Sequence, residues 1–121
     1  MYRLSIIEES LNDNKVLNKM KPYFYSQRIE NVPEDDCPVW HTNEYHIEDD
    51  EIQAVLSFLQ NKVLPTWYIH AFNDKKLYVV LCGKFFELPL YRDEKWNEMI
   101  EYGVKYAQVE RSYLENVPLH I

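Results

Sequence analysis

WYIHAFNDKKLYVVLCGKFFELPLY, residues Trp67 to Tyr91, contains three apolar and aromatic runs separated by turn-forming residues. The polar tetrapeptide Asn73–Lys76 separates the first two runs, and Gly83 precedes the third run at Lys84–Leu88. Asn and Asp favour tight reversals of the backbone, and Gly tolerates a bulge or a corner. The stretch therefore predicts a β-meander that forms the middle of a sheet.

The first two runs of the meander differ in the pattern of their side chains. The run Leu77–Cys82 is apolar at every position, which is typical of a central strand covered on both sides. In the preceding run, Tyr68, His70 and Phe72 share one face, because side chains alternate along a strand.

Two segments have the periodicity of amphipathic helices. The first spans residues 48–63, with acidic residues suited to its first turn and Pro65 beyond its end. The second spans about 93–107, and Gly103 inside it costs about 1 kcal/mol relative to Ala, so we expect an end or a bend there. The two apolar stripes consist of Ile52, Val55, Leu56, Leu59 and Val63, and of Trp96, Met99, Ile100 and Val104.

The N-terminal part of the chain predicts three strands and one short helix. Alternation favours a strand at Tyr2–Ile7, and a helix is expected from about Asp13 until Pro22 ends it. Two further strands are predicted at Tyr23–Glu30 and Val39–Ile47. The proline-containing acidic segment between them, Asn31–Pro38, is expected to be an exposed loop.

These elements predict a single α+β domain over residues 1–121. A chain of 121 residues with 46% hydrophobic composition can bury a substantial core. We expect a mostly antiparallel sheet of about five or six strands with two main helices packed on one face, because both apolar stripes need a sheet face to cover.

Negative charge is concentrated in one segment. The formal net charge is −7, and the segment from Glu30 to Glu51 holds nine acids and no Lys or Arg. The remaining residues hold eleven acids and thirteen bases. A field of this sign repels phosphate backbones, so nucleic acid is not an expected partner. It attracts a basic protein surface or a cation.

Targeting and redox features predict a cytoplasmic protein without a membrane anchor. No apolar run approaches the roughly 18–20 residues that span a bilayer. The start of the chain, MYRLSIIEES, lacks the pattern of a signal peptide. Cys37 and Cys82 are too few for a disulfide framework, so we expect two reduced thiols with Cys82 in the core.

The acidic segment is the first candidate functional region. One interpretation is a solvated loop followed by a well-capped helix start, which needs no function. The other is a docking surface for a basic partner protein, with aromatic anchors among the acids, as tight interfaces are often built. The residues predicted to bind such a partner are Asp35, Asp36, Trp40, Glu44 and Tyr45.

Cys37, His41 and His46 raise the question of a zinc site, because thiolate and imidazole are common zinc ligands. Asp36 or Glu44 would have to complete the set. The spacing matches no compact zinc module, and a straight strand directs His41 and His46 to opposite faces. We therefore predict no metal or other cofactor and interpret these residues as surface polar groups.

His70 is the candidate centre of a small-ligand pocket. It lies beside Tyr68 on a strand, where it could act as a general base if Glu87 on a neighbouring strand tuned its pKa. The alternative is a core histidine with one satisfied hydrogen bond. The sequence has no nucleophile elbow, P-loop or dinucleotide fingerprint, so we predict no catalytic residue.

Ten tyrosines are a further feature of the composition. They could line a concave amphipathic pocket, remain half-buried at its rim, or pack a dimer interface. An exposed aromatic patch or the pairing of an edge strand would produce a homodimer.

The C-terminal half, from about Trp67 to Leu114, resembles a set of small uncharacterised bacterial proteins with no known activity. The matching residues are Trp67, His70, Val79, Val80, Lys84, Phe86, Trp96, Ile100, Glu101, Tyr102, Gly103, Glu110 and Leu114. The resemblance implies a compact bacterial α+β domain and assigns no catalytic or binding residue.

The sequence thus favours a non-enzymatic cytoplasmic interaction module, similar in electrostatics to immunity proteins or inhibitors, that uses the acidic surface at residues 30–51. The alternative is a small-ligand-binding protein or minor enzyme with a pocket around Tyr68, His70 and Glu87.

Overall fold

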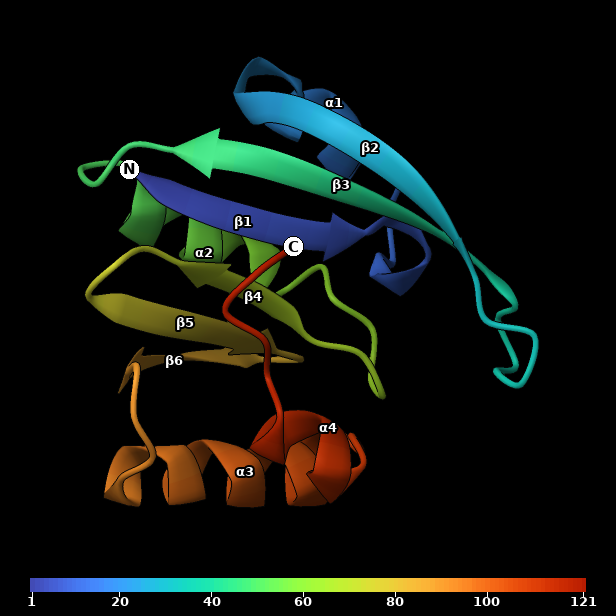
Figure 1. Ribbon diagram of the computed structural model, residues 1–121. Helices are drawn as coiled ribbons and strands as arrows, with labels where there is room; N and C mark the ends of the chain where they lie inside the picture. Colours follow the sequence, from blue (N-terminus) through green and yellow to red (C-terminus); the bar gives the residue numbers. More distant parts are fainter.

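A computed structural model of the chain describes residues 1–121 and contains one six-stranded sheet. All neighbouring strands are antiparallel, in the order β2-β3-β1-β4-β5-β6 (Figure 1). The strands are β1 (Tyr2–Ile7), β2 (Phe24–Asn31), β3 (Val39–Ile47), β4 (Ile69–Phe72), β5 (Lys76–Leu81) and β6 (Lys84–Pro89). The helices are α1 (Lys15–Met20), α2 (Ile52–Leu59), α3 (Glu94–Tyr106) and α4 (Arg111–Glu115), with 3-10 turns at Glu8–Ser10 and Lys21–Tyr23. The predicted α+β class is confirmed.

None of the helices has the length and apolar character that crossing a membrane requires.

The predicted meander is present as β4, β5 and β6. The side chain of Asn73 closes the first turn, where Oδ1 accepts hydrogen bonds from the backbone N–H groups of Lys75 and Lys76, both at 2.8 Å. Gly83 makes the second turn with φ of 94°, a conformation that favours glycine. The meander forms one half of the sheet rather than its middle, because β6 is an edge and β1 and β4 are central.

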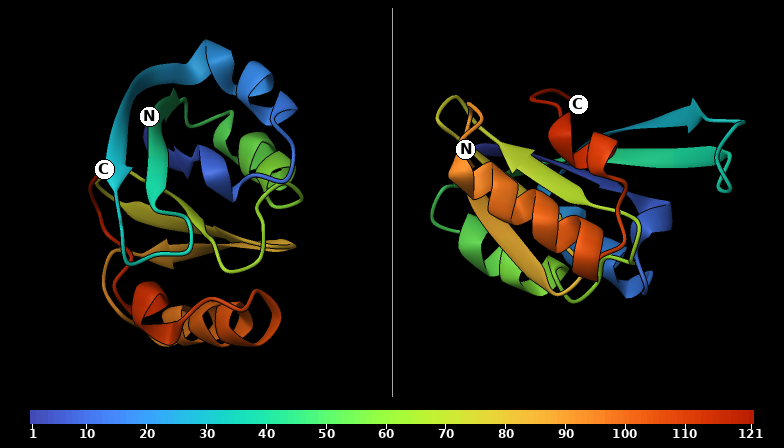
Figure 2. Two further views of the ribbon diagram at one scale, coloured as in Figure 1. Left: turned by 90° about the vertical axis from the view of Figure 1, so that its right-hand side faces the viewer. Right: turned by 90° about the horizontal axis from the view of Figure 1, so that it is seen from below.

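The prediction that both main helices pack on one face is wrong. The apolar stripe of α2 packs with Tyr78 and Val80 of β5, whereas Trp96, Met99 and Ile100 of α3 pack with Leu77, Val79 and Leu81. Val104, which was predicted to belong to the α3 stripe, is 38% exposed. The left view of Figure 2 shows α2 and α3 on opposite sides of β5 and β6. The physical reason lies in β5, whose successive side chains point to opposite faces and are all apolar, so each face needs a helix to cover it.

The C-terminal segment returns to the sheet after α4. The chain ends beside β1 and β4, far from α3 (Figure 1). The backbone carbonyl of His120 lies 3.4 Å from Nε2 of His70 on β4. This return covers part of the face that α3 leaves open, and it borders the cavity described below.

Candidate functional site

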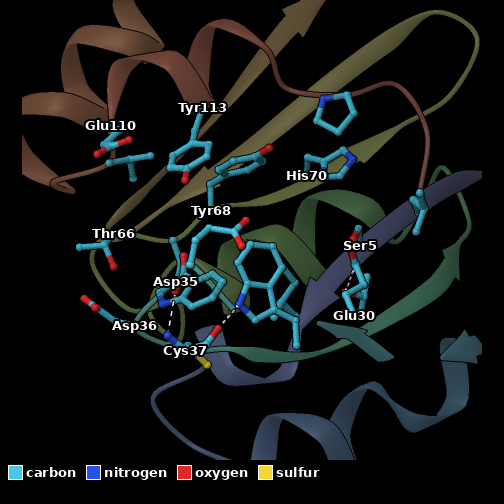
Figure 3. A pocket seen from close by; sticks show the side chains of 18 of the residues that line it. Ser5, Glu30, Asp35, Asp36, Cys37, Thr66, Tyr68, His70, Glu110 and Tyr113 are labelled. Carbon is cyan, nitrogen blue, oxygen red and sulfur yellow. Dashed lines mark hydrogen bonds between the residues drawn. The ribbon is translucent and has the colours of Figure 1, made fainter. Parts of the chain in front are cut away.

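A cleft opens on the face of the sheet that carries α3 and α4. It has a volume of about 820 Å³, and Figure 3 shows most of its lining side chains. Ser5 of β1, Thr42 of β3 and His70 of β4 contribute to its floor, because these three strands are adjacent in the sheet. The loop between β2 and β3 contributes one wall with residues 34–37, and residues between 108 and 121 contribute another.

Aromatic side chains form the centre of the cleft. The rings of Trp40 and Trp67 meet edge to face, with 5.3 Å between their centroids. Nε1 of Trp40 donates a hydrogen bond of 2.7 Å to the carbonyl of Cys37, which fixes the ring relative to the acidic loop. Tyr68 and Tyr113 line the cleft from the other side, as Figure 3 shows. Rings held in this way offer faces for a cation or an apolar group.

Carboxylates without an ion-pair partner surround these rings. Glu34, Asp35, Asp36 and Glu110 line the cleft, and none of them forms a salt bridge. The only Lys or Arg side chain in the lining is that of Arg28, which is paired with Glu30 at 3.2 Å. We call this cavity, defined by its four unpaired carboxylates and four aromatic rings, the acidic cleft.

His70 is largely desolvated at the floor of the acidic cleft. Burial lowers its pKa from 6.5 to about 4, so the ring is neutral at pH 7. Its Nε2 contacts the carbonyl of His120, and its ring stacks on Phe72. No group in the chain forms a hydrogen bond with Nδ1. Because every fully buried side-chain nitrogen or oxygen has a hydrogen-bond partner, Nδ1 is not fully buried and contacts the solvent of the cleft. Burial also raises the pKa of the neighbouring Tyr68 to about 12.

Glu87 does not belong to this site. It pairs in the sheet with Tyr78, whose side chain lies in the α2 core, whereas His70 pairs with Val79, whose side chain lies in the α3 core. Glu87 and His70 are therefore on opposite faces. Lys76, with a hydrogen bond of 2.9 Å, and the hydroxyl of Tyr78 lower the pKa of the Glu87 carboxyl. The prediction of a ligand pocket shared by His70 and Glu87 is wrong.

The structure divides the residues that were predicted to bind a partner. Asp35, Asp36 and Trp40 line the acidic cleft. Tyr45 is 1% exposed within the core beneath α2 and cannot anchor a partner. Glu44 is buried and does not line the cleft.

Glu44 has a structural role in the sheet. The guanidinium of Arg3 donates two hydrogen bonds to its carboxylate, at 2.9 and 3.1 Å. Nε2 of His46 lies 2.6 Å from the same group. Arg3, and then His46, hold the pKa of the Glu44 carboxyl below its ordinary value. The side chain stabilises the pairing of β1 and β3 and is not free to meet a partner.

The structure does not assemble the candidate zinc ligands. His41 Nδ1 lies 2.7 Å from Glu9, and His46 lies beside Glu44 on the other face of β3. The alternation predicted for this strand is thus confirmed. No group of three or more His, Cys, Asp or Glu residues is arranged to hold a metal ion.

The acidic segment does not form one continuous surface. Residues 34–36 lie in the loop before β3, and residues 48–51 lie in the turn after it. These two groups occupy opposite ends of a nine-residue strand, which at about 3.3 Å per residue separates them by roughly 27 Å (Figure 1). The acidic residues of 30–51 therefore do not form the single surface that the sequence predicted, and only those of the first part line the cleft.

Most of the residues that line the cleft were not selected by the sequence analysis. Trp67, Glu110 and Tyr113 have no local motif that marks them as part of a site. Thr66 and Gln108 also line the cleft, and they are the two non-glycine residues with positive φ, at 76° and 58°. The N–H of Thr66 donates a 2.8 Å hydrogen bond to Ala107, which joins segments about forty residues apart. Such a contact leaves no pattern within either segment.

A comparison of the chain with protein-family models, with curated proteins and with solved structures returned no match.

Proposed function

We propose that the protein is a non-enzymatic interaction module that binds a basic partner protein, and that the acidic cleft receives a cationic side chain of that partner. The observation that carries this proposal is the presence of four carboxylates without an ion-pair partner and four aromatic rings in the lining of one open cavity. The electrostatic character resembles that of an inhibitor or immunity protein for a basic enzyme.

Two physical effects favour a cation in this cavity. Four uncompensated negative charges around one opening raise the local concentration of a positively charged partner and accelerate its association. Trp faces bind a Lys or Arg head group by a cation–π interaction of about 0.5–2 kcal/mol, which grows as the group is desolvated. The half-buried Trp40 and Trp67 provide these faces beside Asp35 and Asp36.

A small organic cation is the second candidate occupant. The volume of about 820 Å³ falls within the range of about 300–1,000 Å³ that is usual for small-molecule sites. His70 Nδ1 and the Tyr68 side chain give such a ligand neutral hydrogen-bonding groups at the floor. With a pKa near 4, His70 is a weak base at neutral pH, which favours binding over proton transfer.

The test is a titration of the protein with a synthetic arginine–glycine peptide and with a glutamate–glycine peptide of equal length. Tryptophan fluorescence reports binding, because Trp40 and Trp67 line the cleft whereas Trp96 is buried in the core. The basic peptide is expected to bind and the acidic peptide is not. Neutralising the cleft with Glu34→Gln/Asp36→Asn should weaken binding about tenfold or more.

The matched control is Glu98→Gln/Glu101→Gln, which removes the same charge from the exposed side of α3, away from the cleft. This variant should bind like the wild type. An equal loss of affinity for the basic peptide in both variants would contradict the proposal. A fall in melting temperature confined to the cleft variant would contradict it too, because these residues would then be structural. If free argininamide binds as tightly as the peptide, the small-cation candidate replaces the protein partner.

A further inference from the structure

The two edges of the sheet differ in how they are protected. The outer edge β6 begins at Lys84 and ends at Pro89, and both residue types discourage pairing with another strand. The indole of Trp96 also donates a 3.0 Å hydrogen bond to the Pro89 carbonyl. The opposite edge β2 has eight residues without Lys or Pro, and it pairs only with β3. One edge of the molecule is therefore open to another strand.

The open edge also exposes large apolar side chains. Phe24, Tyr25 and Ile29 of β2 are 49%, 62% and 60% exposed, although such residues usually lie inside a domain. The β2 strand contains a register shift between Phe24 and Ser26 and pairs regularly with β3 from Ser26 onward. A bulge of this kind ends regular pairing at one end of an edge. The part available for pairing is Gln27–Asn31.

We propose that a second copy of this chain pairs with β2 in antiparallel orientation, centred on Ile29, and so joins the two sheets into one. A two-fold axis perpendicular to the sheet keeps each face continuous, so the opposed residues must lie on the same face. Gln27 then faces Asn31 of the second copy, Arg28 faces Glu30, and Ile29 faces itself. These contacts are an amide pair, an ion pair and an apolar pair. Because Nε2 of Gln27 already donates to Glu8 and Asn43, its Oε1 is the group that accepts from Asn31. The ion pair across the axis adds to the Arg28–Glu30 pair within each chain.

Neighbouring registers lack this complementarity. A centre at Arg28 places Arg28 against itself, and a centre at Glu30 places Glu30 against itself. Like charges directly opposite one another destabilise a strand pair. A centre at Gln27 brings Tyr25, inside the bulge, into the pairing. The sequence of β2 therefore selects the register at Ile29, and the occupant that this strand fits best is its own copy.

Ile29, the centre of the proposed pairing, lies outside the acidic cleft, whereas its neighbours Arg28 and Glu30 line that cleft. Ile29 pairs with His41, whose side chain bonds Glu9 on the α2 side of the sheet, so Ile29 lies on the face opposite the cleft. A change at Ile29 should abolish the dimer and leave the binding of the arginine–glycine peptide unchanged. If the dimer is not found, the proposal of a cation-binding cleft is unaffected, and the reverse also holds.

The test is the molar mass of the full chain by light scattering during size exclusion, over a series of concentrations. The wild type is expected to approach the mass of two chains as concentration rises. Ile29→Lys should remain a monomer, because it places two ammonium groups at the axis. The matched control Val104→Lys changes another exposed apolar residue, on α3, and should still dimerise. Circular dichroism checks that both variants fold.

Charge exchange tests the register. Arg28→Glu should be monomeric, because it opposes two pairs of acids, and Arg28→Glu/Glu30→Arg should dimerise again. A wild-type mass of one chain at every concentration overturns the proposal. A dimer that survives Ile29→Lys overturns it too, because the interface then lies elsewhere. If the wild type and Val104→Lys dimerise and Ile29→Lys does not, but Arg28→Glu/Glu30→Arg remains a monomer, the register centred on Ile29 is rejected.

Discussion

His70 illustrates how the surroundings of one residue set its charge. Its ring lies against Phe72 and beneath the returning C-terminal segment, with one weak contact to a carbonyl oxygen. Desolvation is the dominant cause of its low pKa, because no carboxylate is close enough to stabilise a proton on the ring. Folding therefore favours neutral His70, which makes stability depend on pH.

The pH dependence has a definite sign. The pKa of His70 is about 4 in the folded protein and near 6.5 in the unfolded chain, so between these values the unfolded chain binds more protons. The stabilisation is complete above pH 6.5 and is lost as the pH falls towards 4. From pH 7 to pH 5 the free energy of unfolding should decrease by roughly 2 kcal/mol, and His70→Phe should remove most of this decrease.

Urea unfolding at several pH values between 5 and 7 measures the effect. His120→Asn is the control, because it changes an exposed histidine and keeps the backbone carbonyl. Its free energy of unfolding should depend on pH as that of the wild type does. A slope unchanged by His70→Phe would show that another group controls stability in this range.

In helix α3, one glycine decides how closely the whole helix packs against its neighbour. The sequence suggested an end or a bend at Gly103, but α3 continues through it to Tyr106. Gly103 is buried, and a Cβ atom there would lie 2.3 Å from Cδ1 of Leu114 in α4. Glycine is thus required because α4 packs closely against α3 at this point.

Gly103→Ala should destabilise the protein despite the better helix propensity of alanine. The propensity gain is about 1 kcal/mol, whereas forcing an extra carbon into a packed core costs about 1–3 kcal/mol. We expect a net loss of about 1 kcal/mol and a lower melting temperature by calorimetry. Val104→Ala on the exposed side of the same helix has no such contact and should not lower stability. A stabilised Gly103→Ala variant would show that Leu114 moves aside freely.

At the scale of the whole molecule, the sheet separates two hydrophobic cores that share β5. One core contains the stripe of α2, and the other contains the stripes of α3 and α4. Alternate residues of β5 belong to the two cores, so neither core can be lost while the other keeps its sheet face. This arrangement predicts one cooperative unfolding transition.

Truncation on either side should therefore shift the same transition. Leu56→Ala in α2 and Ile100→Ala in α3 each remove a fully buried side chain and should cost about 3 kcal/mol. Far-ultraviolet circular dichroism and Trp fluorescence should give coincident urea curves for both variants. Separate midpoints for the two signals would show that the cores unfold independently.

Local periodicity predicted most of the elements and the face on which many side chains lie. The apolar runs between Asn73 and Gly83 indicated the meander, and the alternation in β3 correctly separated Trp40 from His41. These features follow from backbone geometry within a few residues, where the repeat of a strand or a helix is visible in the chain. Asp35, Asp36, Trp40, Tyr68 and His70 were likewise selected from their own surroundings.

The joining of these residues into one cleft depends on the order of the strands. Because β1 lies between β3 and β4, the acidic loop and His70 border the same cavity. The register of β5 with β4 and β6 places Glu87 on the other face. The placement of α2 and α3 on opposite faces was equally invisible in either helix alone. Both outcomes require all apolar faces to be buried at once, and that condition links residues far apart in the chain, so no local pattern records it.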